Sequence, residues 1–191
     1  MTLGKFATYL KNVSKEIVVI IGGPGTGKST IIDGLAKKGF CCYPEISRQV
    51  TLEAKKQGIE QLFLENPLLF SELLLEERKK QFENALKETQ KIVFIDRGIP
   101  DILAYMHYIG DSYPSHFDLA CRENVYTKIF ILSPWEDIYV SDEERYENFE
   151  QAKLIHNHLT ETYQNYGYEL IKVPNDTLDN RILFILDQIS F

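Results

Sequence analysis

Short apolar segments alternate with helix-length segments along this chain of 191 residues. Little but Ile, Val, Leu and Phe fills residues 17–21, 92–95 and 128–132, as is typical of strands that are buried on both faces. Two weaker runs, at residues 40–43 and 168–173, predict two further strands. Because helix-length sequence separates all five, we expect parallel crossovers and a three-layer α/β fold with a five-stranded parallel sheet.

The intervening segments have the patterns of helices. A helix is expected at residues 30–38, after the glycine-rich string at residues 22–29, and another at residues 71–90, which are rich in the good helix formers Leu, Glu and Lys. Residues 143–166 carry apolar side chains at spacings of three and four, which predicts an amphipathic helix. Ser141 and Glu144 have the spacing of a capping box at its start.

The end of the chain continues the alternation. A last helix is expected near residues 178–189, after a capping signal at Asn175 and Asp176. Residues 58–67 interrupt the pattern and are expected to join two helices. Since no linker, repeat or low-complexity tract is visible, we expect residues 1–191 to form one domain.

Composition restricts the class of protein. Hydrophobic residues make up 44% of the chain and charged residues 26%, which is the balance of a folded globular protein. The net charge of -7 would repel nucleic-acid backbones, so we expect no general binding of DNA or RNA. A local basic pocket for phosphate remains compatible with this charge.

Three cysteines and the first residues of the chain indicate the compartment. Cys41, Cys42 and Cys121 show no C-x-x-C spacing, so we expect free thiols in a reducing compartment rather than disulfides or a zinc site. The first twenty residues lack the apolar core of a signal peptide, and their apolar run is too short to span a bilayer. We therefore expect a soluble, cytoplasmic protein.

The string GGPGTGKS at residues 22–29 fits the phosphate-binding pattern G-x-x-x-x-G-K-[ST] in full. Its glycines allow successive backbone N–H groups to point at phosphate oxygens. Lys28 is expected to reach the β and γ phosphates, and the Ser29 hydroxyl to bind Mg²⁺. The motif follows a predicted strand and opens a predicted helix, which disfavours a glycine-rich turn without a ligand. Nucleotide contacts are expected from Gly23, Pro24, Gly25, Thr26, Gly27, Lys28, Ser29 and Thr30.

Two carboxylates follow strands predicted to end at the same edge of the sheet. Asp96 ends the strand at residues 92–95, where a carboxylate faces the ligand crevice and can hold Mg²⁺, although a turn or cap aspartate would look the same. Glu45 follows the strand at residues 40–43. It is equally compatible with a general base and with an acidic residue in the first turn of the next helix.

Arginines are candidates for stabilising the charge of a phosphoryl-transfer transition state. Arg97 is the strongest because it adjoins Asp96, and Arg48 is weaker. Arg145 lies in the acidic, aromatic connection at residues 133–145, which is a candidate mobile lid. An arginine on a helix is more often a surface ion-pair partner, which is the alternative for each of them.

Other polar and aromatic residues have less specific patterns. Arg78 and Gln81 are three apart on the helix predicted at residues 71–90, and we interpret them as solvated helix surface rather than substrate contacts. Trp135 is interpreted as a packing residue rather than a platform for a base. The four histidines show no spacing that indicates a metal site.

Several motifs together resemble a known family. The strings are GGPGTGKS, PEISRQV, FIDRGIPDILAY, SPWEDIYVSDEERYENFEQA and a final GYELIKVP. From about residue 16 to the end, the chain resembles the small single-domain AAA-like ATPases of bacteria. That group is similar to nucleoside and nucleotide kinases, including the kinase domain that phosphorylates nicotinamide riboside.

The resemblance implies a strand order and several roles. The order would be 2-3-1-4-5, and Glu45 would be the general base. Asp96 and Arg97 match the first two residues of an acidic-Arg-Ser triplet in deoxynucleoside kinases, whereas Gly98 replaces its serine. The loop after the last strand would border adenine, which implicates Pro174 and Asn175.

These observations predict a Mg²⁺-dependent ATP-binding protein that transfers a phosphoryl group to a small hydroxyl-bearing metabolite such as a nucleoside. The alternative is a nucleotide-dependent switch that hydrolyses slowly and signals to a protein partner. GTP stays open as the ligand because no guanine-recognition motif N/T-K-x-D is convincing; the nearest string, at residues 175–178, lacks the lysine.

Overall fold

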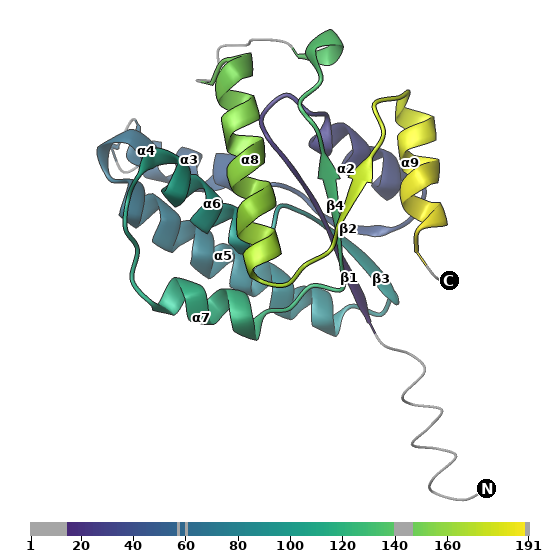
Figure 1. Cartoon of the computed structure of the whole chain (residues 1–191). Helices are drawn as coiled ribbons and strands as arrows, with labels where there is room; N and C mark the ends of the chain where they lie inside the picture. The colour runs from purple at the N-terminus through teal and green to yellow at the C-terminus, as the bar shows by residue number, and fades with distance from the viewer. Residues whose placement is uncertain (1–14, 57, 60, 140–146, 190–191) are drawn as a thin grey trace, which may run out of the picture.

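The computed structural model describes residues 15–56, 58–59, 61–139 and 147–189. Five strands form one parallel sheet in the order β2-β3-β1-β4-β5, as the kinase resemblance implied (Figure 1). The strands are β1 (Glu16–Gly22), β2 (Cys41–Tyr43), β3 (Ile92–Asp96), β4 (Lys128–Leu132) and β5 (Leu170–Val173).

Helices connect the strands throughout. Their bounds are α2 (Lys28–Lys37), α3 (Ser47–Lys56), α4 (Leu62–Glu65), α5 (Pro67–Lys87), α6 (Pro100–Ile109), α7 (His116–Glu123), α8 (Phe149–Asn165) and α9 (Leu178–Asp187), with a 3₁₀ turn η1 (Glu136–Ile138). No helix within the described ranges combines the length and the apolar character needed to cross a membrane.

The central strand β1 determines which groups meet at the carboxyl edge of the sheet. It pairs in parallel with β3, where Ile20 lies beside Asp96, and with β4, where Gly22 lies beside Leu132. Because the strands are parallel, all their carboxyl ends lie at the same edge, where ligands bind in open α/β sheets. Strands β2 and β5 complete the sheet on the outer sides of β3 and β4.

Alternating side chains of β1 divide the interior into two layers. Ile17, Val19 and Ile21 pack in one cluster with residues of α5, α6 and α8. Val18 and Ile20 pack in the other with residues of α2 and α9. Figure 1 shows α8 and α6 on one side of the sheet and α2 and α9 on the other. The two-residue period of a strand therefore builds the three-layer arrangement predicted from the apolar runs.

A further apolar cluster lies outside these two layers. It joins α3, α5, α6 and α7 through residues that include Val50, Leu74, Leu103 and Phe117. Helices α6 and α7 were not among the predicted elements. The cluster supports the segment between β2 and β3 and the loop after β3, both of which carry candidate site residues.

Some helix boundaries differ from those predicted. The amphipathic helix α8 begins at Phe149 instead of residue 143, because Asn148 and Gln151 form a capping box there. The pair Ser141 and Glu144, predicted for that role, lies outside the described residues.

Two further boundaries have local causes. The N-cap of α9 is Thr177, whose hydroxyl accepts from the backbone N–H of Asn180, whereas Asn175 and Asp176 precede the cap. Helix α5 begins at Pro67, four residues earlier than predicted, because proline suits the first turn of a helix, where no backbone donor is needed.

The packing of α8 gives a stability test. Leu159 is fully buried, whereas Leu154 on the same helix is 53% exposed. Replacing Leu159 with alanine leaves a cavity and should lower the free energy of unfolding by about 2 to 5 kcal/mol. Leu154→Ala is the matched control and should change it little. Chemical denaturation measures both, and equal losses would contradict this packing.

Candidate active site

The loop between β1 and α2 has the backbone of a phosphate-binding cradle. Gly25 and Gly27 have φ angles of 73° and 85°, in the left-handed region that favours glycine. A Cβ at Gly22 would lie 2.7 Å from the carbonyl oxygen of Leu132, and a Cβ at Gly23 would lie 2.9 Å from that of Ala152. Backbone conformation and close packing therefore both require glycine in this loop.

Lys28, the first residue of α2, turns back onto the loop. Its Nζ donates a hydrogen bond to the Gly23 carbonyl at 2.8 Å, and the Thr26 hydroxyl donates to the same oxygen at 2.9 Å. Burial, together with the positive charge of Arg97, lowers the pKa of Lys28 from 10.5 to about 7. The Lys28 amine is thus held against the loop, and the carboxylates of Asp96, Glu45 and Asp101 oppose the lowering of its pKa only in part.

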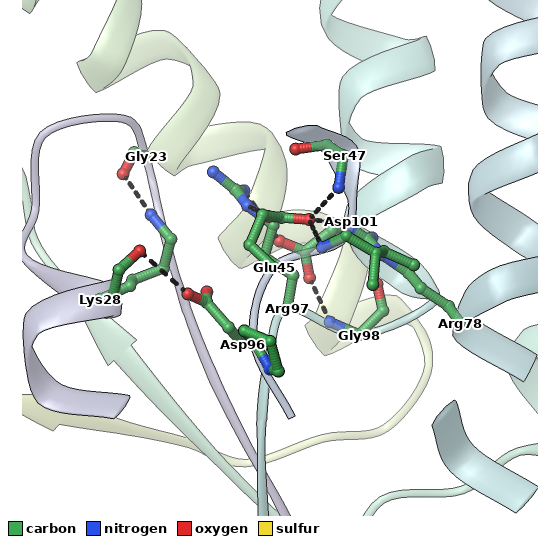
Figure 2. Close-up of polar contacts among 12 residues, drawn as sticks. Gly23, Lys28, Glu45, Ser47, Arg78, Asp96, Arg97, Gly98 and Asp101 are labelled. Carbon is green, nitrogen blue, oxygen red and sulfur yellow. Dashed lines mark hydrogen bonds and ion pairs between the residues drawn. The ribbon is translucent and has the colours of Figure 1, made fainter. Parts of the chain in front are cut away.

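Asp96 and Ser29 face each other across the ends of β3 and the start of α2. The Ser29 hydroxyl donates to Asp96 Oδ2 at 3.3 Å. Asp96 is 1% exposed, and its Oδ1 has no hydrogen-bond partner within the described structure. Burial raises the pKa of Asp96, Lys28 opposes the rise, and Glu45 adds to it. Figure 2 shows the Asp96 carboxylate beside Lys28.

Glu45 is held by donors from three parts of the chain. Its Oε1 accepts from the backbone N–H groups of Ile46 and Ser47, at 3.0 and 3.1 Å, and forms a 3.4 Å contact with Arg78 Nη2. Its Oε2 forms an ion pair with Arg97 Nε. Burial favours the neutral acid, but Arg97, Arg78 and the Ser47 N–H outweigh burial and lower the pKa of Glu45. Glu45 is therefore ionised at neutral pH.

Arg97 connects Glu45 with a second buried carboxylate. Its Nη1 donates to Asp101 Oδ1 at 3.2 Å, and its guanidinium lies 5.7 Å from the ring centre of Tyr105. The φ angle of Arg97 is 70°, a conformation that costs energy for a residue other than glycine. Asp101 Oδ2 accepts from the Gly98 N–H at 2.9 Å and from the Tyr163 hydroxyl at 2.6 Å. Figure 2 shows Glu45, Arg97 and Asp101 gathered beside one another.

The interpretation of Arg78 and Gln81 as solvated helix surface is wrong. Arg78 is 3% exposed and donates to the Gly98 carbonyl at 2.5 Å as well as contacting Glu45. Gln81 is 8% exposed and donates to the Pro44 carbonyl at 2.9 Å. Both lie on the buried side of α5, which packs against the segments that follow β2 and β3.

Other predicted residues lie at or near the same edge. Ser29 and Thr30 are exposed in the first turn of α2, and Pro174 and Asn175 are exposed directly after β5. Arg48 is exposed on α3.

Two predictions concern the segment after β4. Arg145 lies outside the described residues, as do residues 140–144 of the candidate lid. Its described part, residues 133–139, contains η1 and Trp135, which is partly buried.

Three residues of the site and its surroundings were missed by sequence reasoning. Asp101 and Tyr163 complete the network around Arg97, and Arg181 of α9 contacts the phosphate-binding loop. Nothing in the local pattern separates Asp101 or Tyr163 from ordinary helix residues. Arg181 is four residues from Ile185 on α9, a spacing that places the two side chains on the same, buried face of the helix.

The sheet order, the glycine loop and the acidic group at the end of β3 define a P-loop NTPase with a kinase-like fold. An AAA domain family model matches residues 17–181, and the chain belongs to this family. No curated protein matches the sequence.

Solved structures share the fold at low sequence identity. A deoxyadenosine kinase from M. mycoides is 17% identical with a TM-score of 0.68, over 90% of this chain and 97% of that one. A thymidylate kinase from Ehrlichia chaffeensis is 18% identical with a TM-score of 0.58, over 91% and 98%. NadR in complex with NR is 16% identical with a TM-score of 0.70, over 91% of this chain but only 50% of NadR.

The burial of Arg78 predicts an effect that a surface arginine would not have. Arg78→Met leaves the Gly98 carbonyl and one side of Glu45 without their donor, so unfolding should become easier by about 3 kcal/mol. Lys80→Met is the control, because Lys80 is exposed and pairs with Glu77 on the same helix. Thermal or urea denaturation compares them, and similar stability in both variants would contradict the network.

Proposed function

We propose that this chain is a Mg²⁺-dependent ATP-binding phosphotransferase whose acceptor is a small hydroxyl-bearing metabolite such as a nucleoside. The observation that carries this proposal is the position of Glu45. Its ionised carboxylate is held by Arg97 at the same sheet edge as Lys28 and Asp96 (Figure 2). A phosphate-binding loop alone would fit any nucleotide-binding protein, whereas a positioned carboxylate beside it suits an acceptor hydroxyl.

The loop and Lys28 would bind the triphosphate. The backbone N–H groups of Gly23 and of residues 25–29, together with the positive end of α2, favour negative charge. Lys28 would exchange the Gly23 carbonyl for the β and γ phosphate oxygens, and their charge would restore its proton. Pro174 and Asn175, exposed after β5, would border the base. Measuring the binding affinities of ATP and of GTP under the same conditions tests which base is preferred.

Ser29 and Asp96 would hold the magnesium ion. The Ser29 hydroxyl and the Asp96 carboxylate, with its unpartnered Oδ1, offer the oxygen ligands that Mg²⁺ requires. No group of three or more His, Cys, Asp or Glu suited to a metal occurs in the described part of the chain, so phosphate oxygens and water would complete the coordination. When bound, the ion neutralises charge on the phosphate oxygens.

Glu45 would orient the acceptor and receive its proton. The acceptor oxygen attacks the γ-phosphorus while the bond from that phosphorus to the bridging oxygen breaks, and the hydroxyl proton passes to Glu45. The lowered pKa of Glu45 makes it an ionised acceptor of a hydrogen bond but a weak base. This combination suits a loose phosphoryl-transfer transition state, in which proton removal is late and positioning matters most.

The balance of charge at this part of the site supports an uncharged acceptor. The two guanidinium groups, Arg78 and Arg97, are already paired with the two carboxylates, Glu45 and Asp101. An acceptor that carried a phosphate would have to compete for arginines held in buried ion pairs, which costs several kcal/mol per broken pair. A neutral hydroxyl needs no such exchange.

Glu45→Gln tests the proposed role. The variant should bind ATP as the parent does, but phosphorylate an acceptor found in a metabolite panel about 100-fold more slowly or worse. Because Glu45 pairs with two arginines, the melting temperature of the variant should also fall. The rates are therefore compared at a temperature well below that melting temperature. Glu83→Gln, exposed on α5, is the control for charge. Full turnover by Glu45→Gln would leave Glu45 a structural residue, and nucleotide-dependent capture of a protein without acceptor turnover would favour a switch.

The lowered pKa of Lys28 predicts proton uptake on nucleotide binding. With a pKa of about 7 Lys28 is mostly neutral at pH 8 in the free protein, whereas bound phosphates would favour its charged form. Binding at pH 8 should therefore take up a proton, and affinity should fall as the pH rises above 7. Calorimetry in buffers of different ionisation enthalpy measures this uptake. Lys28→Arg is the control, because a guanidinium keeps its proton. If the binding enthalpy of the parent were the same in all buffers, the coupling between proton uptake and nucleotide binding would be refuted.

A further inference from the structure

The phosphate-binding loop is contacted from outside by the last helix. Arg181 of α9 is 4% exposed, and its Nη2 donates to the Thr26 carbonyl at 3.0 Å. Its Nη1 lies 3.0 Å from the position that a Cβ on Gly27 would take. The guanidinium thus packs against two consecutive residues of the loop, Thr26 and Gly27, and Thr26 lies 155 positions earlier in the chain.

This contact determines the direction of one peptide group. The C=O and N–H of a trans peptide point in opposite directions. Arg181 holds the Thr26 carbonyl toward α9, so the N–H of Gly27 in the same peptide is directed away from α9. Gly27 is the last loop residue before Lys28, whose Nζ donates to the Gly23 carbonyl. Through this hydrogen bond Arg181 therefore fixes the direction of the Gly27 N–H, which phosphate binding would use.

The charge of Arg181 has no acidic counterpart within the described residues. None of the ion pairs there includes it, and its Nε is buried without a hydrogen-bond partner. The guanidinium of Arg181 also lies 5.9 Å from the ring centre of Trp135, whose Nε1 donates to Asp137. Burial accordingly lowers the pKa of Arg181. A buried cation without a counter-charge is costly, and an anion bound in the adjacent loop would offset that cost.

We propose that Arg181 is a positioning residue for the phosphates of the bound nucleotide. It orients the Thr26–Gly27 peptide and places a positive charge against the phosphate-binding loop. The inference rests on the proposed nucleotide binding, but not on the transfer reaction or the acceptor. Its target is the phosphate chain rather than the base, because the hydrogen bond from Arg181 goes to the backbone of the phosphate-binding loop itself.

The test compares binding of Mg²⁺-ATP and of inorganic tripolyphosphate to the full chain. Arg181→Gln should bind both about 10- to 100-fold more weakly, the range expected for loss of a charge-assisted interaction. Arg181→Lys keeps the charge but not the planar donor pair, so its affinity should lie between those of the parent and Arg181→Gln. Lys87→Gln, which removes an exposed positive charge at the end of α5, should bind as the parent does.

The outcomes separate this inference from the proposed function. If the parent binds no ATP, the proposed nucleotide binding itself fails. If the parent binds and Arg181→Gln has the same affinity, only the inference fails. Weaker ATP binding with unchanged tripolyphosphate binding would assign Arg181 and Trp135 to the base and overturn it. If Arg181→Gln does not fold, Arg181→Lys decides: an ATP-induced rise in melting temperature equal to that of the parent would refute the positioning role.

Discussion

The buried pairing of Glu45 with Arg97 is the interaction on which the site depends. It joins the segment after β2 to the residue that follows β3, and Asp101 and Arg78 extend it to α6 and α5. Removing either charge would leave the other buried with only one of its two ion-pair partners, Arg78 for Glu45 or Asp101 for Arg97. The left-handed backbone of Arg97 persists because this network surrounds it. The contacts that position the Glu45 carboxylate are therefore also contacts that stabilise the fold.

Much of the sheet and the loop could be predicted from local sequence. Strands β1, β3 and β4 are continuous apolar runs because both of their faces are covered, and that pattern has few other interpretations. The glycine loop could be predicted because its backbone excludes most other residues. The strand order, by contrast, came from resemblance to kinases, since periodicity carries no information about which strands are neighbours.

What could not be predicted depends on contacts between distant segments. Helix α6 was missed because Ile102, Leu103, Ala104 and Met106 are buried around most of its circumference, which removes the amphipathic pattern. Arg78 and Gln81 were misplaced for a different reason. They lie at helical spacing from Leu74, Leu75, Phe82 and Ala85, so their position indicated burial while their residue types indicated solvent. Their position on the helix indicated burial correctly, whereas their residue types did not. Both side chains are buried because they have hydrogen-bond partners, and these partners lie 20 to 37 residues away in the sequence, where a local pattern does not show them.

The contact between Gly23 and α8 has an evolutionary consequence. Residue 23 is one of the positions that the phosphate-binding pattern leaves open to any amino acid. Here a side chain would meet the carbonyl oxygen of Ala152, which is backbone and cannot be exchanged by mutation. No single compensating substitution in α8 would make room, because the whole helix would have to shift away from the loop. An amino acid other than glycine at residue 23 therefore requires a different placement of α8. Related proteins that differ at this position should also differ in how that helix packs.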